Sequence, residues 1–122
     1  MIELAERIVE RKSFEFAIKI VKAIRGLRKD TREYELLNQL LRSGTSIGAN
    51  IAEATYAQSD KDFHLKRRIA LKEANETKYW LKLLRETEVM DKETADGLVK
   101  DIDELIRIIT SIIRTTQEKL DQ

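Results

Sequence analysis

Apolar side chains return along this chain with the period of an α-helix, not with the alternation of a β-strand. The pattern predicts four helical segments, over residues 13–27, about 31–57, 60–86 and 92–120. In the last and clearest of them the apolar positions are Ala95, Leu98, Val99, Ile102, Leu105, Ile106, Ile109, Ile112 and Ile113. In the first, the central apolar stripe consists of Phe14, Ala17, Ile18, Val21 and Ile24, widened by Phe16, Ile20, Ala23 and Leu27. We expect both stripes to face a common core.

Helix start signals divide the chain in the same way. Ser59 and Asp91 are typical N-terminal caps for the third and fourth helices. Ser13 is a similar candidate cap for the first helix, which would leave residues 1–12 as a short helix or an N-terminal arm. Because the connections are short, neighbouring helices must run antiparallel. The sequence therefore predicts an all-α fold, an antiparallel up-down-up-down four-helix bundle that forms one domain over residues 1–122.

The segment 31–57 has two unusual faces. Its apolar side carries small residues at i, i+4 and i+8, which would let another helix approach closely: Gly44, Gly48 and Ala52. Its polar side is nearly uncharged, although 37% of the chain is charged. This side includes a polar stripe of Ser46, Asn50 and Glu53. We interpret the stripe as hydrogen-bonding within the bundle or across a subunit contact rather than as a ligand site, and expect Glu53 to pair with Arg42 or with a basic residue of 60–86.

The segment 60–86 has more apolar surface than one core face needs. A heptad-like stripe contains Phe63, Ala70, Ala74, Thr77, Leu81 and Leu84. A second stripe, about 100° away around the helix, contains Leu65, Ile69, Trp80 and Leu83. Large apolar patches that one chain leaves bare usually mark partner surfaces, so we predict an oligomer interface here. Glu73 and Glu76 border this stripe and would need polar partners.

Basic residues also gather on the segment 60–86. Within about 100° of helical arc lie His64, Arg67, Arg68, Asn75, Lys78, Lys82 and Arg85. This arc is either an ordinary charged face or a stripe that contacts nucleic-acid phosphates, in which case the binding residues would be Arg42, Arg67, Arg68, Lys78, Lys82 and Arg85. His64 is interpreted as a solvated surface residue. Tyr34, Tyr56 and Tyr79 do not form an aromatic ladder and are not counted as evidence for nucleic acid.

The composition of the chain argues against several classes of function. The net charge of +1 argues against the strong global field of a highly basic nucleic-acid binder. However, residues 59–90 carry eight basic and six acidic groups, whereas residues 91–122 carry five and eight. The chain has one histidine, no cysteine and no catalytic motif, so we expect no enzyme, no metal and no cofactor. We also expect a cytoplasmic protein without a membrane segment, since no long apolar run occurs.

Several blocks of the sequence resemble a known family. They are Lys12 to Ala17, Gln39 to Glu53, Asp62-Phe63 and Ile69 to Leu81. They are similar to bacterial four-helix bundle proteins encoded by intervening sequences in 23S ribosomal RNA genes, which are related to the accessory variability determinant of diversity-generating retroelements. The resemblance covers about residues 12–115. It implies a bundle that assembles as a ring, a homopentamer, with an RNA-related role. The family motif falls on Arg42, Ser43, Ser46, Asn50, Glu53, Phe63, Glu73 and Glu76.

Two functional hypotheses remain. The first is a non-enzymatic, ring-forming bundle that binds RNA or a ribonucleoprotein through repeated basic patches. The second is an assembly scaffold that docks a partner protein and binds no nucleic acid itself. Phosphate contacts produce a steep dependence of affinity on salt, so a salt series distinguishes the two.

Overall fold

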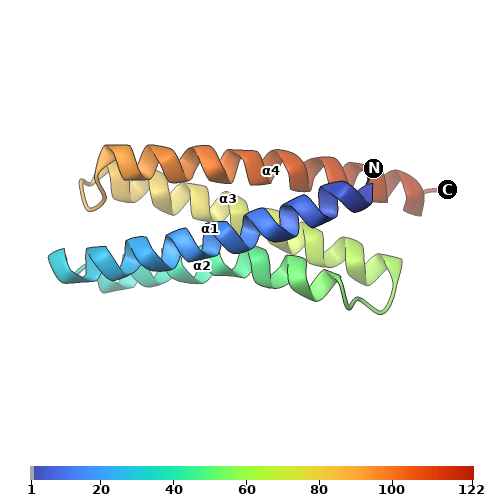
Figure 1. Cartoon of the computed structure of the whole chain (residues 1–122), viewed down its shortest axis with the longest axis horizontal. Coiled ribbons are helices and arrows are strands. Elements are labelled where there is room, and N and C mark those ends of the chain that lie inside the picture. The colour runs from blue at the N-terminus through green and yellow to red at the C-terminus, as the bar shows by residue number, and fades with distance from the viewer. Residues whose placement is uncertain (1) are drawn as a thin grey trace.

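A computed structural model describes residues 2–122 and contains four helices in antiparallel arrangement (Figure 1). They are α1 (Ile2–Asp30), α2 (Tyr34–Ala54), α3 (Asp60–Glu86) and α4 (Lys92–Leu120). They pack in the cyclic order α1, α2, α3, α4, so that α1 and α3 lie on a diagonal of the bundle. The predicted four-helix bundle is confirmed, and α3 and α4 have the predicted bounds.

The helix start signals of α3 and α4 act as predicted. The Ser59 hydroxyl accepts a hydrogen bond from the Asp62 backbone N–H at 3.1 Å, and the Asp91 carboxylate accepts one from the Thr94 N–H at 2.9 Å. This bond to the Thr94 N–H holds the pKa of Asp91 below its usual value. Each cap satisfies a backbone donor that has no partner within the helix, which defines where the helix begins.

The prediction of a separate short helix or arm over residues 1–12 is wrong for residues 2–12, because α1 runs without a break from Ile2, and residue 1 lies outside the described residues. Ser13 lies in the helix interior, where its buried hydroxyl donates to the Glu10 carbonyl oxygen at 3.2 Å. The apolar period continues upstream of Ser13 through the buried Val9. Packing of this earlier turn on the core outweighs the local tendency of serine to begin a helix.

The apolar stripe predicted for α1 is rotated from the buried face. The buried side chains are Val9, Ser13, Phe16, Ile20 and Ile24. Phe14 and Ile18, which were assigned to the centre of the core face, are 67% and 41% exposed. The buried face is the one that was predicted only to widen the stripe, through Phe16 and Ile20, because this side of α1 packs on the glycines of α2.

Small residues on α2 determine how α1 docks. A methyl group added at Gly44 would lie 3.0 Å from Ile20 Cγ1, and one added at Gly48 would lie 3.3 Å from the Ser13 carbonyl oxygen. The predicted close approach of another helix is therefore confirmed at these two glycines. It is not found at Ala52, which is exposed. Each glycine destabilises the helix by about 1 kcal/mol relative to alanine. The close contact with α1 offsets this loss.

The core extends along the whole bundle and draws on every helix. Its largest fully buried side chains include Phe16, Leu40, Leu81, Ile102 and Ile109. Within residues 2–122 no helix has a stretch that is both long and apolar enough to cross a bilayer.

Candidate nucleic-acid interface

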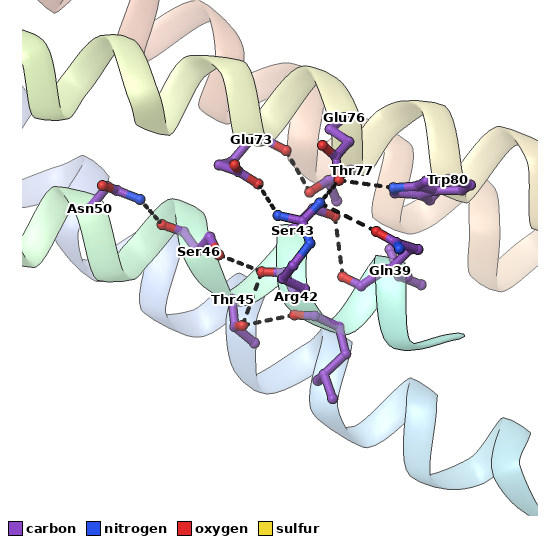
Figure 2. Close-up of polar contacts among 12 residues, drawn as sticks. Gln39, Arg42, Ser43, Thr45, Ser46, Asn50, Glu73, Glu76, Thr77 and Trp80 are labelled. Carbon is purple, nitrogen blue, oxygen red and sulfur yellow. Dashed lines mark hydrogen bonds and ion pairs between the residues drawn. The ribbon is translucent and has the colours of Figure 1, made fainter. Parts of the chain in front are cut away.

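A polar network joins α2 to α3 on the bundle surface (Figure 2). Arg42 Nη1 donates a hydrogen bond to Glu73 Oε2 at 3.1 Å. Its Nη2 donates to Glu76 Oε2 and also, at 3.4 Å, to Gln39 Oε1. The Trp80 indole N–H donates to the same Glu76 oxygen at 3.1 Å. The network thus contains two carboxylates and one guanidinium, so its net charge is negative. Arg42 was predicted to contact phosphates, but here its charge is already paired.

The polar stripe of α2 bonds mainly to its own helix. Ser46 Oγ donates to the Arg42 carbonyl oxygen at 2.6 Å, and Asn50 Nδ2 donates to the Ser46 carbonyl oxygen at 2.8 Å. Glu53 is the member that reaches another helix, through an ion pair with Lys66 at 3.3 Å. The predicted pairing of Glu53 with a basic residue of 60–86 is therefore confirmed.

Arg67 lies inside the bundle, so its prediction as a phosphate contact is wrong. It is 2% exposed, and its Nη2 lies 2.8 Å from Glu6 Oε1 on α1. Its guanidinium carbon lies 3.2 Å from the centre of the Phe63 ring. Burial lowers the pKa of Arg67 and raises that of Glu6, and the charge of each partner opposes these shifts. The ion pair links the diagonal helices α1 and α3.

His64 was predicted to be a solvated residue, but it is buried. Its Nδ1 lies 2.9 Å from Thr116 Oγ1. The Thr116 hydroxyl also lies 3.0 Å from the Ile112 and Ile113 carbonyl oxygens, to which it donates. Because the hydroxyl hydrogen is used in this way, the Thr116 oxygen accepts the hydrogen bond from His64 Nδ1–H. Both His64 and Arg67 fall on the helix face that continues through Ala70, and this face is buried.

Two further predicted cations bind carboxylates of α4. Lys78 Nζ lies 2.7 Å from Asp103 Oδ1, and Arg85 Nη1 lies 2.8 Å from Asp96 Oδ1. Hydrogen bonds to Asp96 and Glu86 raise the pKa of Arg85. The basic and acidic excesses of residues 59–90 and 91–122 therefore offset each other along the α3–α4 contact.

The outward face of α3 carries the cations that remain. Exposed residues recur on this face every three or four positions. We call this row the outer seam, and it consists of Lys61, Leu65, Arg68, Lys72, Asn75, Tyr79, Lys82 and Glu86. Within residues 2–122, none of its four cations forms an ion pair; these are Lys61, Arg68, Lys72 and Lys82. Arg68 and Lys82 belong to the predicted set. Lys61 and Lys72 were missed, although the seam follows directly once positions 64 and 67 are known to face inward.

The apolar residues predicted to form an oligomer interface are only partly exposed. Leu65 is 53% exposed on the outer seam, whereas Ile69, Trp80 and Leu83 are half-buried. None of the four is fully buried within the single chain, so the interface stays a prediction. A more open apolar surface lies on α1, which we call the α1 outer face. It is a shallow hollow lined by Phe14, Ala17, Ile18, Val21, Lys22 and Arg25.

Comparison with known proteins relates this architecture to a family. A family model described as 23S rRNA-intervening sequence protein matches residues 5–111. The chain belongs to this family. The matched region contains the α2–α3 network, the outer seam and the α1 outer face. No curated protein matches the sequence significantly.

A solved structure supports the family and the fold together. The chain is similar to a crystal structure of a protein of unknown function from the S23 ribosomal protein family of Bacteroides thetaiotaomicron VPI-5482. The two share 47% sequence identity with a TM-score of 0.87, and the match covers 90% of this chain and 98% of the other. The family resemblance stated from the sequence is thus confirmed.

Proposed function

We propose that this protein is a non-catalytic, self-associating helical bundle that binds RNA through the phosphates along the outer seam of α3. The observation that carries the proposal is the row of four exposed cations without carboxylate partners, on a helix whose other cations are mostly paired or buried. The family description refers to an intervening sequence of 23S rRNA, which supports RNA as the polymer.

The charge distribution determines what kind of binding to expect. A net charge of +1 provides no strong long-range attraction, so affinity must come from local contacts. Each lysine or arginine that neutralises a phosphate releases counterions, and this makes binding salt-dependent. One seam with four cations would bind weakly. Several copies in a ring, expected to be a homopentamer, would present several seams to one RNA and increase the avidity.

Replacing Arg68, Lys72 and Lys82 together with alanine is expected to weaken RNA binding and flatten its salt dependence. Losing three contacts would make the negative slope of log affinity against log salt shallower by about 2. This corresponds to roughly 100-fold weaker binding at 0.1 M salt. The measurement is fluorescence anisotropy of a labelled RNA over a salt series.

The matched control removes the same charge elsewhere. Lys29 and Arg32 are exposed around the α1–α2 turn and Arg114 is exposed on α4, and none of the three forms an ion pair within the described chain. Replacing these three with alanine should leave most of the affinity in place. Equal losses in the two triple variants would show that binding follows net charge, which contradicts a role for the seam.

The second candidate function is an assembly scaffold that docks a partner protein and does not bind RNA. The α1 outer face favours it, because Phe14 is 67% exposed in an apolar hollow flanked by cations. Exposed apolar hollows of this kind are typical of protein-binding surfaces. Assembly without RNA affinity at low salt would support the scaffold over the first proposal.

Self-association has its own test. If copies associate through the α1 outer face, replacing Phe14 and Ile18 with serine converts the assembly to monomers, whereas association through the predicted α3 interface leaves the mass unchanged. The melting temperature of the bundle should change little, since neither side chain is in the core. Size-exclusion chromatography with light scattering measures the mass. Tyr34→Ser, which also removes an exposed large side chain, is the control and should leave the mass unchanged. A double variant of unchanged mass would contradict the use of this face.

A further inference from the structure

The C-terminal half of the outer seam holds an exposed aromatic ring. Tyr79 is 60% exposed and lies in a shallow, mostly apolar hollow of about 460 Å³. The hollow is lined by Asn75, Lys78, Tyr79, Lys82, Leu83 and Glu86. Seam cations lie on both sides of the ring, Lys82 three residues after it and Lys72 seven residues before it. At the rise of an α-helix these separations are roughly 5 Å and 10 Å along the axis.

Tyr79 is held in place by its neighbour. Its ring meets the Trp80 ring edge-on, with centroids 5.1 Å apart and planes at 76°. Trp80 is in turn fixed by the hydrogen bond from its indole N–H to Glu76 (Figure 2). The tyrosine ring is therefore exposed to solvent on one side and packed against the Trp80 ring on the other. An aromatic ring that is already ordered loses little conformational freedom when a ligand stacks on it.

We propose that Tyr79 stacks against an unpaired RNA base in this hollow, while Lys72 and Lys82 hold the phosphates on either side of that base. The inference rests on the proposed RNA-binding function and adds to it the kind of RNA. Bases offer their faces only where the strand is unpaired, because in an A-form duplex they are stacked on each other. The seam thus binds single-stranded RNA more tightly than duplex RNA, which would contact its cations alone.

Asn75 adds a polar group one turn before the tyrosine. Its Nδ2 donates to the Leu71 carbonyl oxygen at 3.2 Å, which leaves Oδ1 as an acceptor at the rim of the hollow. A base stacked on Tyr79 could donate from an exocyclic amine to this oxygen. The combination of an aromatic face, flanking cations and a side-chain amide matches the way that single-stranded nucleic acids are bound.

The test compares Tyr79→Ala and Tyr79→Phe with the unaltered full chain. The probes are a fluorescein-labelled single-stranded RNA and a duplex of the same length, titrated by anisotropy over a salt series. Tyr79→Ala should weaken single-strand binding roughly 5- to 100-fold and leave duplex binding unchanged. Its salt slope should match that of the unaltered protein, because no charge is removed. Tyr79→Phe keeps the ring and should keep the affinity.

Two further readouts make the test specific. Trp80 is the only tryptophan, so its emission should change when single-stranded RNA binds and should no longer change in Tyr79→Ala. Tyr56→Ala removes a tyrosine that is 87% exposed and lies off the seam, and it should bind like the unaltered protein. Circular dichroism melting confirms that each variant is folded.

The outcomes separate the two proposals. Normal single-strand affinity in Tyr79→Ala, or an equal loss for both RNA forms, overturns base stacking, and a retained salt slope would still support the seam. Binding of neither RNA by the unaltered protein at low salt overturns both proposals and leaves the hollow as a surface for a protein partner.

Discussion

Replacing Arg67 with alanine is expected to destabilise the bundle by up to roughly 3–5 kcal/mol, the cost of removing one partner from a fully buried ion pair, since Arg67 is buried and the Glu6 side chain is 26% exposed. The change removes the 2.8 Å contact with Glu6 and the stacking on Phe63. It also leaves the Glu6 carboxylate partly desolvated without a counter-charge, and it opens a void between α1 and α3. Urea unfolding followed by circular dichroism measures the loss.

The loss should depend on pH in a defined direction. Burial raises the pKa of Glu6 and the charge of Arg67 opposes that rise, so removing Arg67 raises the pKa further. Below about pH 4, Glu6 is protonated in both the folded and the unfolded chain, and an uncompensated charge no longer exists. The destabilisation by Arg67→Ala should therefore be larger at pH 7 than at pH 4.

A second substitution isolates the charge. In Arg67→Ala with Glu6→Gln no partly buried carboxylate is left unpaired, so at pH 7 the double variant should be more stable than Arg67→Ala alone. Arg68→Ala is the control for losing an arginine from an exposed site and should change stability by less than about 0.5 kcal/mol. Similar losses for Arg67→Ala and Arg68→Ala would contradict a buried pair.

Replacing Ile109 with alanine is expected to cost roughly 2–5 kcal/mol, because a fully buried isoleucine leaves a cavity that its neighbours fill only in part. Ile109 is 0% exposed and belongs to the core stripe of α4. The free energy of unfolding in urea is again the quantity to measure.

The neighbouring Ile108 provides a matched control. It is half-buried at the edge of the core and loses the same atoms when replaced by alanine. We expect a clearly smaller loss for Ile108→Ala. If the two variants unfold at the same urea concentration, α4 is rotated from the orientation described above.

The comparison of α4 with α1 shows where sequence reasoning succeeds. In α4 the apolar residues form one unbroken stripe between a cap at Asp91 and the end of the helix, so period, start and face agree. In α1 the cap signal at Ser13 conflicts with the apolar residues before it. A serine in a buried position looks the same in the sequence as a serine at a helix start, and the packing on α2 decided between them.

The candidate site was predicted in part. Arg68 and Lys82 were identified from charge and spacing, and they lie on the outer seam. Arg67 was assigned to the same surface because charged residues are rarely buried. The partner that allows its burial, Glu6, lies 61 positions earlier on a different helix, and no local pattern connects the two.

Taken by itself, the sequence determined the number of helices, their antiparallel order, the core face of α4 and the family, because periodicity, caps and motifs are local properties of the chain. The tertiary structure alone decided which face of α1 docks on the glycines of α2, which cations are buried or paired, and which remain free along α3. These depend on contacts between residues far apart in the sequence, and such contacts exist only once the four helices have packed.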